Sequence, residues 1–178
     1  MDYGCLISPA AARGLPEGSR ERALARLGLR QWWHIVLDPC PALVKSFPPD
    51  GLAILDPFLQ YAFERKLSMG WSLHGHLLLW LEDNHFASFS EDAATELLAA
   101  AAARWTNTDQ SEDKAILLHF HARPGTGIAG WKSRAAAEEN RVVLVDLPGA
   151  RLEGRGISMA ACTDAQYPED FLWSKLPQ

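Results

Sequence analysis

An alanine-rich run behind a helix cap constrains the fold of this chain most strongly. Ser90 is followed by two acidic residues and then by the run Ala93–Ala103. Serine accepts a hydrogen bond from a free N–H of a first helical turn, acidic side chains there face the positive end of the helix dipole, and alanine has the highest helix propensity. Because small side chains permit close approach, this helix is expected to lie against a β-sheet.

Apolar runs elsewhere in the chain provide the strands of such a sheet. The most strand-like are rich in β-branched and other apolar residues: Ala115–Ala122, Val142–Leu147 and Ile157–Ala161. Shorter or more aromatic runs predict further strands at Tyr3–Ile7 and Leu29–Leu37. A central hairpin is expected from Trp71–Leu81, a turn at Asp83–Asn84, and a returning strand at His85–Phe89.

Cap and stop signals predict the remaining helices. Ser19 begins one that ends before Gly28, and Asp56–Pro57 begins another that reaches about Lys66. Shorter helical segments are expected at Ala42–Lys45, Trp131–Glu139 and Pro168–Lys175. The order of elements predicts an α/β or α+β fold in which residues 1–178 form a single globular domain, with a mixed β-sheet and a central hairpin covered by helices.

Composition and charge exclude several classes of protein. Of the 178 residues, 48% are hydrophobic and 22% charged, which is typical of globular proteins and not of disordered chains. The net charge of −5 argues against binding to duplex nucleic acid. No run of 18 apolar residues is present, and Met1–Pro16 lacks the basic-then-apolar order of a secretory signal. A cytosolic protein is therefore expected.

Three cysteines, Cys5, Cys40 and Cys162, lie far apart and form no CxxC pair. This spacing matches neither a disulfide framework nor a zinc knuckle, so buried, reduced thiols are expected.

A glycine-rich segment resembles a broken phosphate-binding loop. Gly125 and Gly130 have the spacing of GxxxxGK[ST], but Trp131 stands before Lys132 and Ser133. One inserted residue turns Lys132 by about 100° around a helix, away from the phosphate. The run Val142–Gly149 is similar to the hydrophobic strand that ends in a magnesium-binding aspartate. One hypothesis is therefore a nucleotide-binding domain with a degenerate P-loop.

Two His-x-His pairs form a second candidate site. His74 and His76 alternate on one predicted strand, and His119 and His121 on another, so each pair shares one face of a sheet. If the two strands were neighbours, four imidazoles could converge on a transition metal. The alternative is that these histidines lie half-buried and bond to neighbouring groups.

An acidic segment is the third candidate. Residues 82–113 contain eight acidic residues and one basic residue, a local charge of −7. The acidic residues most accessible for docking are expected at helix ends and in a loop: Glu91, Asp92, Asp109, Glu112 and Asp113. Such a patch can steer a basic partner, although many charge runs serve only solubility.

These observations favour a non-catalytic cytosolic binding protein. The leading hypothesis is a regulator, antagonist or immunity-type inhibitor that binds a basic protein through Glu91, Asp92, Asp109, Glu112 and Asp113. It predicts no cofactor, no bound metal and no catalytic residue. The nucleotide-binding domain and a metal-dependent enzyme that uses the paired histidines stay as alternatives.

Overall fold

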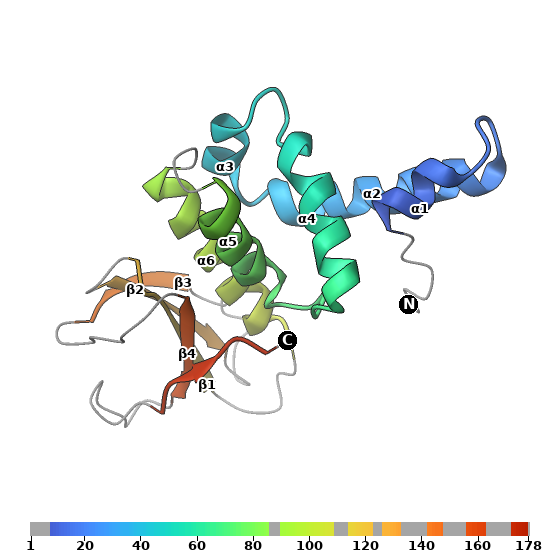
Figure 1. The fold of residues 1–178 in the computed structure, drawn as a ribbon. Coiled ribbons are helices and arrows are strands. Elements are labelled where there is room, and N and C mark those ends of the chain that lie inside the picture. Colours follow the sequence, from blue (N-terminus) through green and yellow to red (C-terminus); the bar gives the residue numbers. More distant parts are fainter. Residues whose placement is uncertain are drawn as a thin grey trace.

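In the part of the chain that the structure describes, six helices precede five strands. In the computed structural model of the protein, the described residues are 8–85, 90–108, 114–122, 126–132, 142–147, 156–162 and 172–177. The helices are α1 (Pro9–Gly14), α2 (Arg20–Leu37), α3 (Pro41–Ser46), α4 (Leu52–Arg65), α5 (Leu73–His85) and α6 (Glu91–Thr106). The strands are β1 (Lys114–Phe120), β2 (Thr126–Lys132), β3 (Val142–Asp146), β4 (Ile157–Cys162) and β5 (Ser174–Lys175). Figure 1 shows this segregation, and the predicted α+β class is confirmed.

The strands form one sheet in the order β3-β2-β1-β4-β5. The pairings between described strands are all antiparallel. The predicted mixed sheet would also contain parallel pairs. Leu118 of β1 is paired with Ile128 of β2 and Met159 of β4, so these three side chains lie on the same face of the sheet. Among the described strands, β3 and β5 form its two edges.

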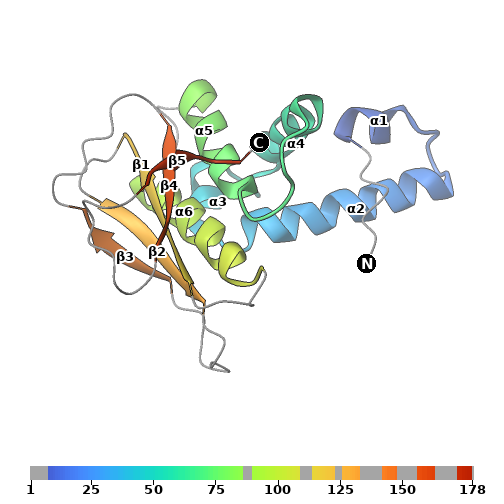
Figure 2. The same ribbon diagram turned by 90° about the horizontal axis from the view of Figure 1, so that it is seen from below.

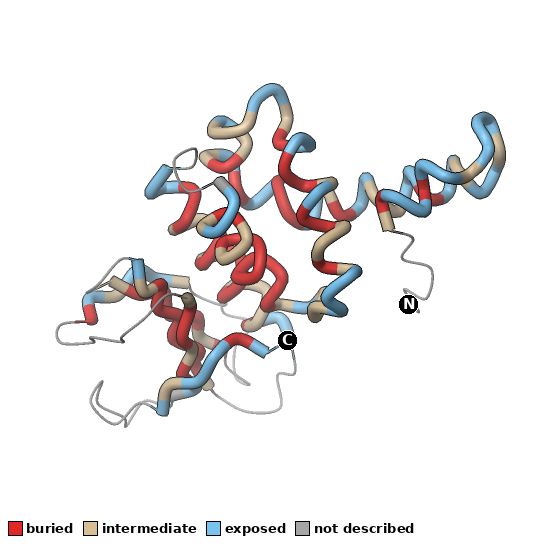
Figure 3. The backbone as a smooth tube through the Cα atoms, viewed as in Figure 1, coloured by how far each residue is buried: buried red, intermediate tan, exposed pale blue. Residues whose placement is uncertain are grey.

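Helices cover one face of the sheet, with α5 and α6 nearest to it (Figures 1 and 2). Leu118 and Phe120 of β1 share a buried cluster with Leu77 of α5 and Leu97 of α6. Figure 3 shows this continuous buried region between the sheet and the inner helices, while α1 and the first half of α2 project away from it. Helices and sheet therefore depend on a common hydrophobic core for their stability.

The segment Leu29–Leu37 is helical, so the strand predicted there is wrong. α2 begins after the Ser19 cap, as expected, but continues through Gly28 to Leu37. The aromatic and β-branched content suggested a strand. The buried or half-buried apolar residues, however, recur at helical spacing: Leu29, Trp32, Trp33, Val36 and Leu37. Periodicity decides between the two because it determines which side chains reach the core.

The predicted hairpin over Trp71–Phe89 is also wrong. Residues 73–85 form α5, which includes Asp83 and Asn84, and residues 86–89 lie outside the described part. Residues 72–78 are all buried, so α5 is covered nearly all round. A helix buried on every side loses its polar stripe, and a short apolar run of this kind cannot be told from a buried strand.

Several helix boundaries also differ from expectation. α4 begins at Leu52 after Gly51, which has a left-handed φ of 76°, so Asp56 and Pro57 lie inside the helix. Ser174 and Lys175 form β5, which contradicts the end of the helix predicted at Pro168–Lys175. The short helix near Ala42–Lys45 and the Ser90 cap are confirmed. The strand expected at Tyr3–Ile7 lies outside the described residues.

Among the described residues, no helix is both long enough and apolar enough to cross a bilayer.

Candidate functional site

The glycine-rich segment is a strand and forms no phosphate loop. Residues 126–132 are β2, so no helix begins at Trp131, and residues 133–139 lie outside the described part. A side chain at Gly130 would come within 3.1 Å of Ala102 Cβ on α6, and one at Gly127 within 2.9 Å of the Leu118 carbonyl oxygen. These glycines permit close packing of backbone and helix, which overturns the P-loop interpretation.

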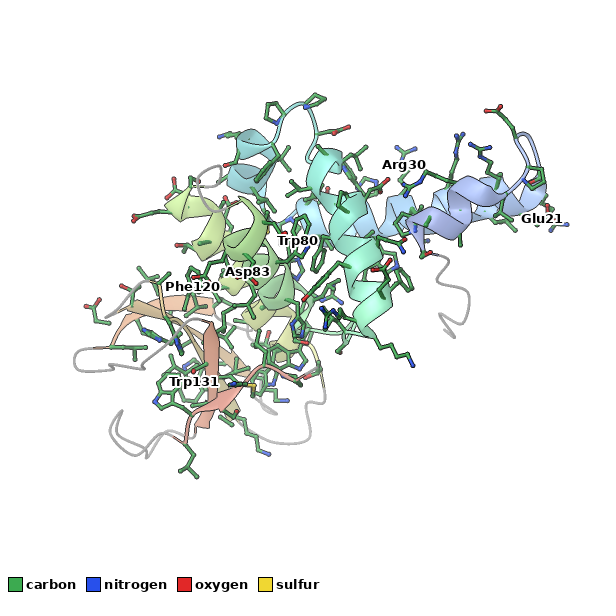
Figure 4. The ribbon with its side chains drawn as sticks, in the orientation of Figure 1. Glu21, Arg30, Trp80, Asp83, Phe120 and Trp131 are labelled. Atoms are coloured by element: carbon green, nitrogen blue, oxygen red, sulfur yellow. The ribbon has the colours of Figure 1, made fainter. Side chains whose placement is uncertain are left out.

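Lys132 contacts a tryptophan of α6 and does not belong to a phosphate-binding loop. Its Nζ lies 4.3 Å from the centroid of the Trp105 ring on α6, and the residue is buried. Trp131, the preceding residue, is on the opposite side of the sheet (Figure 4). The alternation of a strand thus sends Lys132 toward α6, where it makes a cation–π contact.

The His-x-His pairs do not converge. His74 and His76 are on α5, where residues two apart point in different directions, so the prediction of a shared sheet face is wrong for this pair. His76 Nε2 donates to the Pro177 carbonyl oxygen at 2.8 Å. Within the described ranges, no three His, Cys, Asp or Glu side chains could hold one metal ion.

His74 is the most deeply buried titratable group of α5. Neither ring nitrogen has a hydrogen-bond partner among the described residues. Burial, and then the nearby positive charge of Arg104, lower the pKa of His74 to about 4. The backbone groups of Ile35 and Val36 oppose this shift of the pKa only in part. His74 is therefore neutral at physiological pH and acts as a core residue.

His119 of β1 and His121, one residue beyond its end, lie on the same face of the sheet, as predicted, on the side away from the helices. Their ring centroids lie 5.6 Å apart, and the Trp173 ring lies 6.1 Å from His119. Ser158 Oγ is 2.8 Å from His121 Nε2, which resembles a nucleophile and its base. However, His121 Nδ1 is buried with no hydrogen-bond partner in the described residues, so nothing there orients the ring for catalysis.

The predicted acidic patch is only partly described. Glu91 and Asp92 are exposed in the first turn of α6, as expected. Asp109, Glu112 and Asp113 lie outside the described residues. Glu96 has a different role, because its carboxylate accepts from the N–H groups of Ala42 at 2.7 Å and Leu43 at 3.4 Å. It thereby caps α3, whose N-cap residue makes no side-chain cap bond.

Cys40 lies beside this cap as a free, buried thiol, as predicted. Burial, and secondly the charge of Glu96, raise the pKa of Cys40 to about 12. The thiol therefore stays protonated and unreactive near neutral pH.

β3 is the feature that sequence reasoning did not recognise as a site. Within the described strands it pairs with β2 on one side only, which leaves its other edge outermost. Val143 and Leu144 are 44% and 61% exposed on opposite faces of this strand. The run Val142–Leu147 was predicted as a strand because it is unusually apolar, but the run itself did not indicate a position in the sheet.

A cavity of about 330 Å³ opens beside β3, between the sheet and the start of α6. Leu144 contributes to its wall from β3, and Phe120 and Ile128 from the neighbouring strands. Figure 4 shows Phe120 on the helix side of the sheet. Glu91 and Thr95 line it from α6, and Glu91 is the one charged residue among the described lining residues. Leu144 connects this cavity to β3, and the cavity and the outer edge of β3 are together called the β3 groove below.

The fold and this groove define an α+β protein with an apolar, acid-rimmed groove beside a sheet edge. The chain belongs to the MbnC-like family: the model of this family, described as methanobactin biosynthesis cassette protein MbnC-like, matches residues 13–177. A search of curated proteins finds no match.

Family membership corrects the function predicted from the sequence. A protein of a biosynthesis cassette has a biosynthetic role, so the interpretation as a regulator, antagonist or immunity-type inhibitor is wrong. That interpretation came from charge distribution and missing motifs, neither of which specifies a pathway.

Proposed function

We propose that this chain serves methanobactin biosynthesis by binding an extended peptide segment in the β3 groove. The observation that carries the proposal is an outermost strand with a cavity directly beside it. Family membership supplies the biosynthetic context. The groove supplies the chemistry of recognition, and the two together favour a peptide that takes part in the pathway.

The outer edge of β3 can provide the main-chain part of this recognition. The outermost strand of a sheet has backbone N–H and C=O groups directed away from its one neighbour, and an extended peptide can pair with them as an additional strand. β3 is five residues long, enough for two or three pairs of backbone hydrogen bonds.

The cavity and its rim provide selectivity. Alternate side chains of an added strand would point to the helix side, as Leu144 does, and the apolar walls formed by Phe120, Ile128 and Leu144 suit an aliphatic or aromatic side chain. Exposed Glu91 and Asp92 favour a Lys or Arg nearby in the peptide. The expectation of a basic partner is thus retained in this form. We also propose that binding occurs in the cytosol.

Peptide binding can be tested with the other reading frames of the same cassette. Overlapping peptides of about ten residues, longer than β3 itself, would be tiled across them and measured by fluorescence anisotropy. We expect a basic peptide to bind and Leu144→Glu to weaken it about ten-fold or more, because the added charge faces the apolar cavity. Leu172→Glu is the matched control, since Leu172 is 90% exposed and precedes β5 at the opposite edge of the sheet.

Backbone methylation distinguishes strand addition from simple adhesion. In an added strand only every second N–H bonds to β3, so N-methylation of one alternate set should abolish binding and methylation of the other set should not. The proposal would be contradicted if both methylated sets changed the affinity equally. It would also be contradicted if Leu172→Glu weakened binding as much as Leu144→Glu, or if no peptide bound at all.

A further inference from the structure

A second hollowed surface is lined by residues of α1, α2 and α4. Figure 2 shows these helices at the end of the molecule away from the sheet, with α1 and α4 along one side of α2. Two cavities of about 390 and 220 Å³ share Arg26, Leu29 and Asp56 in their walls and are therefore adjacent. Four arginines line it: Arg13, Arg22, Arg26 and Arg30. We call this surface the arginine cleft.

The charges of the arginine cleft are unbalanced. Asp56 is the single acidic residue among the described residues of its walls, and it pairs with Arg13 at 3.6 Å. Arg22 donates to the Leu15 carbonyl oxygen. Arg26 and Arg30 are exposed and make no hydrogen bond or ion pair to any described residue. Two guanidinium groups thus stand at the rim without a partner in the described part of the chain (Figure 4 labels Arg30).

The floor of the arginine cleft is apolar. Leu29 and Trp33 of α2 face Leu52 and Leu55 of α4 across it, and Leu52 is 42% exposed. The indole N–H of Trp33 donates to the Asp50 carbonyl oxygen, which fixes the ring in the wall. An apolar floor with a cationic rim matches a ligand that has apolar side chains on one side and carboxylates beside them.

We propose that the arginine cleft docks an acidic amphipathic helix of another protein encoded in the same cassette. Arg22, Arg26 and Arg30 recur every four residues, so their Cα atoms rise by about 6 Å each along α2. Carboxylates spaced three or four residues apart on a partner helix have nearly the same repeat. The two adjacent cavities and the apolar floor fit a helix better than a small anion, which would need only one cluster of donors.

The partner segment can be identified by crosslinking from inside the cleft. A photo-crosslinking amino acid would replace Leu52 in the full chain, which would be expressed with the remaining proteins of its cassette and irradiated. Mass spectrometry would then locate the crosslinked peptide. We expect a segment of net negative charge with acidic residues three or four apart. Crosslinks only to a second copy of this chain, to a segment without such acids, or to nothing would overturn the proposal.

Affinity measurements with a synthetic copy of the captured segment test the arginines. The double variant Arg26→Glu/Arg30→Glu should weaken binding about ten-fold or more, and added salt should weaken wild-type binding. Arg20→Glu/Lys45→Glu makes the same change in net charge at exposed positions outside the cleft walls and should leave affinity within about two-fold. Equal losses in both double variants would mean that net charge alone drives association, and would refute docking in the cleft.

Discussion

At the scale of single residues, His74 couples the stability of the helical core to pH. The ring is completely buried, and its pKa in the folded protein is lowered to about 4. In the unfolded chain a histidine titrates near 6.5, so the unfolded chain binds the proton more readily. Between these two pKa values the free energy of unfolding therefore falls as the pH falls, and above about 6.5 it does not depend on this group.

We expect His74 to account for about 2 kcal/mol of lost stability between pH 7 and pH 5. Urea unfolding at the two pH values measures this loss in the wild type. In His74→Leu the difference between the two pH values should shrink by about that amount, because no imidazole titrates there. His34→Asn is the control, since His34 is exposed, and an equal shrinkage in this variant would contradict the assignment to His74.

At the scale of elements, the close contact between α6 and β2 determines how the sheet meets its helices. Gly130 stands opposite Ala102 and Thr106, where an added Cβ would lie 3.1 Å from both side chains and 3.2 Å from the Ala102 carbonyl oxygen. The alanine run of α6 and Gly130 of β2 are thus complementary, because each has a small side chain or none where the other element lies against it.

Gly130→Ala should lower the free energy of unfolding by about 1–3 kcal/mol, because backbone and side-chain atoms of α6 must move to admit the methyl group. Gly28→Ala is the matched control: this glycine is inside α2 with no atom within 4 Å of the added Cβ. There the same change should stabilise by about 0.5–1 kcal/mol through helix propensity. Chemical denaturation of both variants checks the opposite signs.

The helices and strands differ in how well the sequence could predict them. Cap chemistry is local. The caps Ser19 and Ser90, and the starts of α2 and α6 that follow them, could therefore be recognised from a few neighbouring residues. The strands at 115–122, 142–147 and 157–161 were recognised by composition. α5 was not, because its environment is created by α6, the sheet and the last described residues, which together bury all of residues 73–78 in its first half.

The candidate surfaces were harder to predict than the elements. The apolar character of Val142–Leu147 predicted a strand, and only the order of the described strands places it at an edge. The arginine cleft joins α1, α2 and α4, and α2 had been divided into a helix and a strand. Arg22, Arg26 and Arg30 share a face only once that division is removed. Glu91 and Asp92 could be placed, since their helix was correctly predicted.

At the scale of the whole molecule, the last described residues join the sheet to the helices. Ser174 and Lys175 pair with Met159 and Ser158 of β4, and the chain then crosses to α5. There a Cβ on Gly75 would lie 2.6 Å from Leu176 Cδ1, so the absence of a side chain makes room for Leu176. His76 donates to the Pro177 carbonyl oxygen one residue further on.

We expect Leu176→Ala to cost about 2–3 kcal/mol of stability, because Leu176 is buried against Gly75 and leaves a cavity when truncated. His76→Ala should cost about 1–2 kcal/mol through the unpaired Pro177 carbonyl. Since both contacts hold one segment, the double variant should lose clearly less than the sum, once the segment has detached. A double-mutant cycle by urea unfolding measures the coupling. Strict additivity would mean that Leu176 and Pro177 are held independently, and that this crossing does not act as one unit between sheet and helices.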